Sequence, residues 1–171
     1  MVEMSIESVR VSASGQQRVV VLKEKETDRY LLIWVGTPEA GAIALSMQGI
    51  AVARPMTHDL LKSVIEAMGA SVKRILVTEL VDNTFYARIL IDVDGRTVEV
   101  DARPSDAIAL ALRMHATIFV NERVLEEAGI SAGSESAKSE AEDLSIFRDF
   151  INSLGVDDSA PPSEGGQRPS S

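Results

Sequence analysis

The sequence predicts an α+β fold in which two similar β3α2 halves form one curved or barrel-like sheet covered by helices. Stretches in which β-branched and aromatic residues alternate with polar ones indicate the strands. Apolar residues at helical spacing indicate the helices. An internal repeat, with matching segments about 65 residues apart in the chain of 171 residues, indicates the two halves.

The first half is expected to contain three strands followed by two helices. The run Val19-Val20-Val21-Leu22 is typical of a strand, and Ser14-Gly15 marks the turn before it. Leu60, Leu61, Val64 and Ile65 have the spacing of an apolar helix face. The predicted strands cover 4–13, 17–24 and 29–35, and the predicted helices cover 38–48 and 57–68.

The second half is expected to repeat this order. Its strand signal is clearest in the run 85–91, Phe-Tyr-Ala-Arg-Ile-Leu-Ile. Asp94-Gly95 is the strongest hairpin signal in the chain, and Asp82-Asn83 is expected to form another turn between strands. The predicted strands cover 71–81, 84–93 and 95–101, and the predicted helices cover 104–114 and 121–128.

The repeat is carried by short matching runs, which assign the two halves to about 4–69 and 71–129. Ala42-Ile43-Ala44-Leu45 matches Ala107-Ile108-Ala109-Leu110, and Val64-Ile65-Glu66 resembles Val124-Leu125-Glu126. Residues alike in both halves are expected to pack the core. Each half alone would leave an apolar sheet face open, so the halves are expected to join in one sheet.

The composition changes near residue 131, so we expect one domain over 1–130 and a tail over 131–171. The tail begins as a Ser- and Gly-rich acidic linker. Leu144, Phe147, Phe150, Ile151 and Leu154 then recur at helical spacing, which predicts a short amphipathic helix over 141–154 and a disordered end. This helix should pack on its own domain or dock on another subunit or protein partner, because so short a helix is unstable alone.

Charge and composition exclude several classes of function. The net charge is −9, which disfavours any partner held by a broad basic surface. The absence of cysteine excludes disulfides and thiolate metal sites. No apolar run is long enough to cross a membrane, and the N-terminus does not resemble a signal peptide, so we expect a cytoplasmic protein without membrane contact.

The first polar cluster is the run 54–59, Arg-Pro-Met-Thr-His-Asp, directly before an apolar helix. Thr57 is the expected N-cap, and Asp59 suits the positive end of the helix dipole. Arg54 and His58 are less easily explained by structure, because a cation at a helix start is unfavourable without an anion there. His58 could act as a base. The structural alternative is a partly exposed His58 beside an Arg54–Asp59 ion pair.

The second polar cluster is the run 101–106, Asp-Ala-Arg-Pro-Ser-Asp, which also leads into an apolar helix. Ser105 and Asp106 are ordinary residues for a helix start. A helix start does not require Asp101 and Arg103, so these two residues need another explanation. They could pair with each other, or Arg103 could bind a phosphate while Asp101 and Asp106 hold a divalent ion.

Glu39 is another carboxylate at a helix start, where it could reach a site or complement the helix dipole. Other signatures are absent. The sequence has no phosphate-binding Gly-rich loop, dinucleotide fingerprint, His-Glu-x-x-His zinc motif or Gly-x-Ser-x-Gly elbow. Seven aromatic residues without a basic stripe beside them make a stacking surface for single strands improbable.

Over residues 5–130 the chain resembles the bifunctional nuclease family, which includes bacterial proteins of uncharacterised role and plant proteins described as degrading both DNA and RNA. Four motifs in the order and spacing of the family carry the resemblance: Tyr-Leu-Leu-Ile-Trp-Val-Gly at 30–36 with Glu39-Ala40, Arg-Pro-Met-Thr-His-Asp-Leu at 54–60, Thr-Phe-Tyr-Ala at 84–87, and Asp-Ala-Arg-Pro-Ser-Asp-Ala-Ile-Ala-Leu at 101–110. The chain departs from the family pattern at His115 and Thr117, which makes His115 a poor catalytic candidate.

The resemblance implies a modest nuclease acting on RNA, DNA or both. The mechanism we assign uses a general acid or base, cations that neutralise the scissile phosphate, and carboxylates that orient these groups or bind Mg²⁺ or Mn²⁺. The candidate catalytic residues are His58, Asp59, Arg54, Arg103, Ser105 and Asp106. The candidate metal ligands are Asp101, Asp106 and Asp59.

Net acidity leads us to expect weak, local contacts with nucleic acid. Separately, we expect a homo-oligomer such as a dimer. The alternative function is a non-catalytic oligomeric module that binds an anion at helix N-termini or a regulatory protein through the acidic tail.

Overall fold

The computed structural model describes residues 1–12, 15 and 17–131. The predicted linker, the 141–154 helix and the disordered tail lie outside these residues. The order of elements is β1 (Val2–Val11), β2 (Arg18–Glu24), β3 (Arg29–Val35), α1 (Thr37–Met47), α2 (Thr57–Ala67), β4 (Ser71–Val81), β5 (Thr84–Val93), β6 (Arg96–Ala102), α3 (Pro104–Met114), β7 (Thr117–Val120), α4 (Glu122–Ala128) and β8 (Gly129–Ser131).

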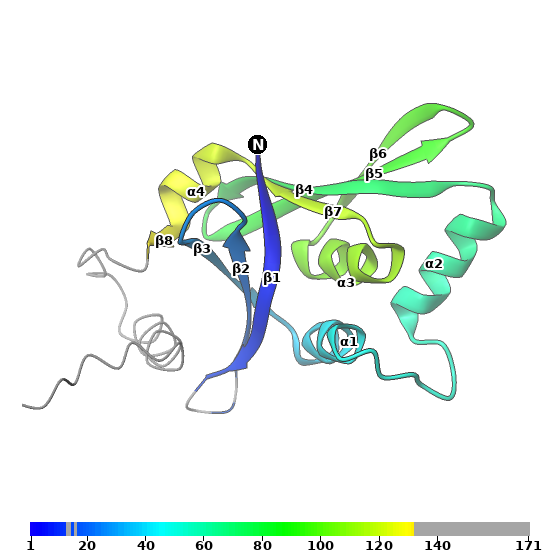
Figure 1. The fold of residues 1–171 in the computed structure, drawn as a ribbon, viewed down its shortest axis with the longest axis horizontal. Helices are drawn as coiled ribbons and strands as arrows, with labels where there is room; N and C mark the ends of the chain where they lie inside the picture. Colours follow the sequence, from blue (N-terminus) through cyan, green and yellow to red (C-terminus); the bar gives the residue numbers. More distant parts are fainter. Residues whose placement is uncertain (13–14, 16, 132–171) are drawn as a thin grey trace, which may run out of the picture.

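The described strands form one eight-stranded mixed sheet in the order β6-β5-β4-β7-β1-β2-β3-β8. Two antiparallel meanders, β1–β3 and β4–β6, are joined by β7, which lies antiparallel to β1 and parallel to β4. The sheet twists strongly between the two meanders (Figure 1). Since β6 and β8 are free ends, the sheet is open rather than closed into a barrel.

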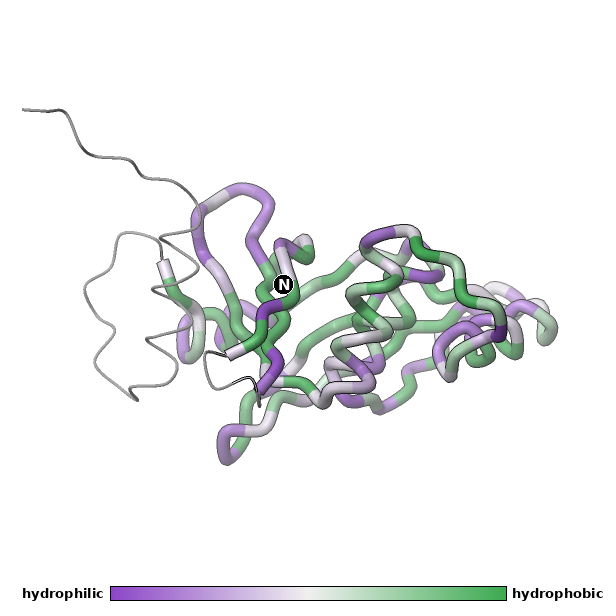
Figure 2. The backbone as a smooth tube through the Cα atoms, turned by 90° about the horizontal axis from the view of Figure 1, so that it is seen from below, coloured by the Kyte–Doolittle hydropathy of each residue, from purple (hydrophilic) through white to green (hydrophobic). Residues whose placement is uncertain are grey.

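Helix α3 lies at the centre of the core. The run Ala107–Leu110 has no measurable exposure, because α1 and α2 pack on the outer side of α3 while β4 and β5 pack on the inner side (Figure 1). Small alanines permit this close approach. In the matching run of α1, Ala42 and Ile43 are buried but Ala44 and Leu45 are partly exposed. Apolar residues follow the strands, while hydrophilic ones gather in several turns (Figure 2).

The α+β class is confirmed, and the predicted strands and helices lie within a few residues of the observed ones. Two short strands, β7 and β8, were not predicted and have no counterpart among the described residues of the first half. The division into two equivalent repeats therefore stays a prediction. No helix in the described part of the chain is both long and apolar enough to cross a membrane.

Candidate functional site

The N-terminal ends of three helices carry the polar side chains of the site. The N-caps are Gly36 for α1, Met56 for α2 and Arg103 for α3. The expectation that Thr57 caps α2 is wrong: Thr57 is the first helical residue, and the Met56 amide is satisfied by the Asp59 carboxylate at 2.8 Å. This bond is one half of a capping box, so Asp59 fixes the start of the helix that carries the candidate base.

Arg103 connects α3 to α1. Its Nε donates to Asp106 Oδ2 at 2.7 Å, and its Nη2 donates to Glu39 Oε1 at 2.8 Å and to Asp106 Oδ1 at 3.2 Å. Arg103 therefore pairs with Asp106 and Glu39 rather than with Asp101. Its side chain stays 66% exposed, and Nη1 makes no hydrogen bond to any residue that the structure describes. An exposed guanidinium with free N–H groups is suited to bind a phosphate oxygen.

His58 connects α2 to the same carboxylate. Its Nε2 lies 3.0 Å from Asp106 Oδ1, and its side chain is only 8% exposed. Because an ionised carboxylate only accepts hydrogen bonds, Nε2 carries the proton in this contact and Nδ1 is the nitrogen left for proton exchange. Glu39, Arg103, Asp106 and His58 thus form one network across α1, α3 and α2, which we call the His58 network.

The network favours the ionised forms of Asp106 and Arg103. Partial burial raises the pKa of Asp106, but hydrogen bonds from Arg103 and His58 outweigh it, so the pKa is lowered overall. The carboxylates of Asp106 and Glu39 raise the pKa of Arg103. Asp106 is therefore ionised at neutral pH and is able to orient the imidazole ring as a hydrogen-bond acceptor.

Asp59 follows His58 directly in the sequence, but it is not part of the His58 network. Its partner is Arg113. Arg113 near the end of α3 donates from Nε to Asp59 Oδ1 at 2.5 Å, from Nη1 to the Ala109 carbonyl at 2.8 Å and from Nη2 to the Ala42 carbonyl at 3.2 Å. Arg113 thereby joins α1, α2 and α3. The expected Arg54–Asp59 pair does not form, since the partner of Asp59 is Arg113.

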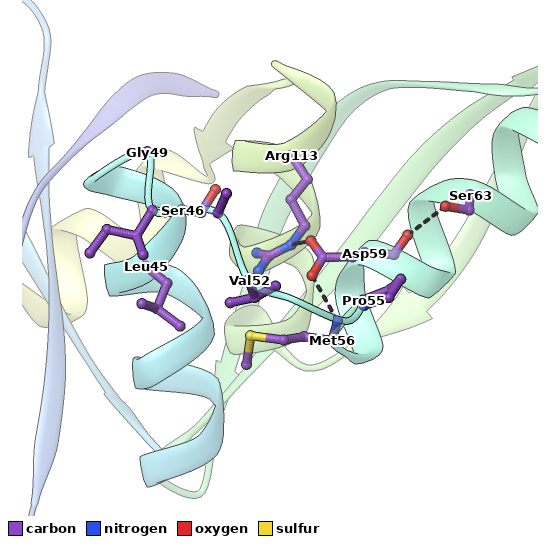
Figure 3. Close-up of a pocket in the computed structure, with 11 residues that line it drawn as sticks. Leu45, Ser46, Gly49, Val52, Pro55, Met56, Asp59, Ser63 and Arg113 are labelled. Carbon is purple, nitrogen blue, oxygen red and sulfur yellow. Dashed lines mark hydrogen bonds and ion pairs between the residues drawn. The ribbon is translucent and has the colours of Figure 1, made fainter.

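Figure 3 shows this contact in a pocket of about 390 Å³ between the end of α1 and the start of α2. The Met56 amide, followed by Arg113, lowers the pKa of Asp59. His58, Arg103 and Asp106 do not line the pocket. Arg113 is a site residue that was not predicted. The available signal was a single cation in the last turn of α3, directly after the uninterrupted apolar run 107–112.

Asp101 lies on β6 directly opposite Arg88 on β5, whereas the next pair, Ala102 and Ala87, faces the core. Neighbouring strand residues point to opposite sides of a sheet, so Asp101 faces away from α3. Arg54 is exposed in the connection before α2 and has no ion pair with a described residue, and Ser105 is buried at 7% exposure. The structure thus brings together only part of the predicted site.

The predicted metal ligands do not fit a divalent ion. Both oxygens of Asp59 and both oxygens of Asp106 accept hydrogen bonds from protein donors, and Asp101 lies on the other side of the sheet. Within 1–12, 15 and 17–131, no three His, Asp or Glu side chains are grouped closely enough to hold a metal ion. Metal binding stays a prediction.

Comparisons with known proteins point to one family. Residues 20–133 match the bifunctional nuclease domain. An uncharacterized protein of Mycobacterium tuberculosis (strain H37Rv) is 40% identical over 161 residues, covering 91% of this chain and 96% of that protein. Bifunctional nuclease 1 of Oryza sativa subsp. indica is 31% identical over 127 residues, and Bifunctional nuclease 1 of Arabidopsis thaliana is 29% identical over 135 residues.

The plant relatives are longer proteins. The match covers 71% of this chain but 38% of the rice protein, and 75% of this chain but 42% of the Arabidopsis protein. The chain therefore spans less than half the length of the plant relatives, and more than half of each plant protein has no counterpart in the match.

Proposed function

Because the chain belongs to the bifunctional nuclease domain family, we propose that it hydrolyses phosphodiester bonds in RNA, DNA or both. The observation that carries this proposal is the His58 network, which places an exposed arginine and a histidine–carboxylate pair around the same Asp106. These are the groups that phosphodiester cleavage needs: a cation for the charge of the transition state and a group that moves a proton.

Each member of the network has a separate task in this proposal. Arg103 binds a phosphate oxygen through Nη1, with exposed Arg54 as a second cation. Asp106 orients His58, and Nδ1 of His58 accepts a proton from the attacking water or delivers one to the leaving oxygen. Asp59, Ser105 and Asp101 are left without contact to substrate. No step is assigned to a metal ion.

The test is cleavage of labelled single-stranded RNA and DNA by the purified full chain, with Mg²⁺, with Mn²⁺ and with EDTA. We expect His58→Ala and Arg103→Ala each to lower the cleavage rate by about 100-fold or more, because general acid–base catalysis and transition-state charge stabilisation contribute at this level. The EDTA arm tests the separate prediction that a divalent ion assists.

Two variants of the same residue types serve as controls. His115→Asn changes the other histidine and suits the left-handed backbone at this position, and Arg96→Ala removes an exposed arginine of β6. Both should cleave like the unmodified chain. If all four variants cleave equally, the activity comes from a contaminant and the proposal fails. Stabilisation by phosphate or nucleotides without any turnover would instead favour the anion-binding function.

Homo-oligomerisation and a cytoplasmic location stay predictions. Light scattering on the full chain tests whether it forms a homo-oligomer.

A further inference from the structure

The two strands β2 and β3 bury apolar side chains on both faces of the sheet. On one face Val20, Leu22 and Ile33 join the main core. On the other face Val19, Val21 and Tyr30 form a separate cluster with exposures of 0%, 1% and 2%. Leu32 packs against this cluster. We call this group of four side chains the β2–β3 cluster.

No described helix contributes a side chain to the β2–β3 cluster. The helices that pack on these strands are α1, α3 and α4, and their buried residues, such as Ile43, Ile108 and Val124, belong to the main core on the opposite face. Side chains with almost no exposure need a covering surface. The described helices pack on the opposite face of the sheet, so they do not cover the β2–β3 cluster. Another part of the molecule must cover it.

The described chain ends beside this cluster. Strand β8 pairs with β3, with Ile130 opposite Tyr30 and Ser131 opposite Arg29. Only two strand spacings, about 10 Å, separate β8 from β2. Residues 132–140 connect Ser131 to the predicted amphipathic helix, and nine extended residues can span up to about 30 Å. The 141–154 segment can therefore reach the cluster without strain.

The composition of this segment suits the cluster. Its apolar residues, spaced to share one side of a helix, are Leu144, Phe147, Phe150, Ile151 and Leu154. Three acidic residues and one arginine give the segment a net charge of −2. Lys23 is the direct strand partner of Tyr30, and Arg10 is the direct strand partner of Val19, so both cations lie on the face of the cluster. Lys23 already pairs with Asp28 at 3.0 Å, which reduces its share of the positive charge facing the segment. The charges of segment and surface are complementary.

We propose that segment 141–154 docks through its apolar side on the β2–β3 cluster of its own chain. An exposed apolar surface elsewhere is less suited. It consists of Leu60 and Val64 on α2 and of Met68 directly after it. Helix α2 lies beside the β4–β6 part of the sheet, at the opposite end of the strand order from β8 (Figure 1). The docked segment gives the acidic tail a fixed place on the domain, away from the His58 network.

Trp34 reports on this docking directly. It is the single tryptophan of the chain, it is the direct strand partner of Val19, and it is 37% exposed. In the full chain, the double variant Phe147→Asp/Phe150→Asp should shift Trp34 emission to the red and increase its quenching by iodide. The matched control Ser145→Asp/Asn152→Asp places the same charges on the opposite side of the predicted helix and should leave emission and quenching unchanged.

A cysteine pair tests the same contact without relying on a destabilised variant. The natural chain has no cysteine, so Leu32→Cys/Phe150→Cys can form only the intended bond within one chain. We expect oxidation to give a disulfide-linked monomer on a non-reducing gel. The proposal is overturned if Trp34 responds equally to both double variants. It is also overturned if the oxidised product is a dimer or if Trp34 quenching depends on protein concentration, since both indicate docking between chains.

Discussion

Arg113 fixes the relative position of three helices through side-chain contacts alone. It is 8% exposed on the side chain, and it bonds to Asp59 on α2 and to the Ala42 carbonyl on α1. Asp59 in turn caps the helix that carries His58. Removing the guanidinium would leave the Asp59 carboxylate, which is only 32% exposed, without its cation.

We therefore predict that Arg113→Ala lowers the free energy of unfolding by about 2–4 kcal/mol, measured by urea denaturation. The control is Lys62→Ala on α2, the helix that carries Asp59. Lys62 forms a 3.8 Å pair with Glu66 in which both side chains are at least one third exposed, so its loss should change stability by no more than about 0.5 kcal/mol. Equal effects of the two variants would contradict the role given to Arg113.

Asp59 also determines a pH dependence. Its pKa is lowered in the folded protein by the Met56 amide and Arg113, so the unfolded chain takes up a proton at higher pH than the folded one. The stability contributed by Asp59 is thus complete above the usual aspartate pKa of about 3.9 and is lost as pH falls below it. The pKa of Asp106 is also lowered in the folded protein, so Asp106 likewise loses its contribution to stability as pH falls.

We predict that the free energy of unfolding decreases from about pH 5 to pH 3, and that Asp59→Asn makes this decrease smaller. Asparagine can still accept from the Met56 amide, so this variant removes the charge rather than the cap. Asp94→Asn in the β5–β6 turn is the control and should preserve the slope of the full chain, because Asp94 has no ion pair with a described residue. A slope unchanged by Asp59→Asn would contradict the prediction.

At the scale of elements, the sequence predicted most strands and helices because their signals are local. The Asp82-Asn83 turn and the Asp94-Gly95 turn are both observed with positive φ, as expected for two-residue hairpins. Strand β7 was missed because four residues are too few to show a period. It also begins two residues after His115, which has φ of 52° at the end of α3, where glycine is the commoner residue.

The candidate site was only partly predictable, because its contacts join elements far apart in the chain. Sequence placed Arg103 and Asp106 at one helix start, and their contact three residues apart was within reach of local reasoning. The contact of Asp106 with His58 depends on how α2 packs on α3, which the sequence does not show. Asp101 was grouped with Arg103 by proximity in sequence, but strand alternation turns it to the other side of the sheet.

At the scale of the whole molecule, net charge limits how nucleic acid is bound. The chain carries −9, of which the body 1–130 holds −4 and the residues 131–171 hold −5. This net charge disfavours a broad basic surface, so we expect phosphate to be held by individual cations. The proposed function uses Arg54 and Arg103, which gives two phosphate contacts.

Two phosphate contacts predict that the affinity for RNA depends only weakly on salt concentration. For single strands the slope of log K against log salt concentration is about −0.7 per neutralised phosphate, so we expect about −1.4. The measurement is fluorescence anisotropy of labelled single-stranded RNA from 50 to 200 mM KCl, made with His58→Ala so that the RNA stays intact. In this background Arg103→Ala should reduce the slope by about 0.7, whereas Arg96→Ala should leave it unchanged. A slope steeper than about −4 would require a basic surface that the charge distribution does not provide, and would place RNA binding outside the His58 network.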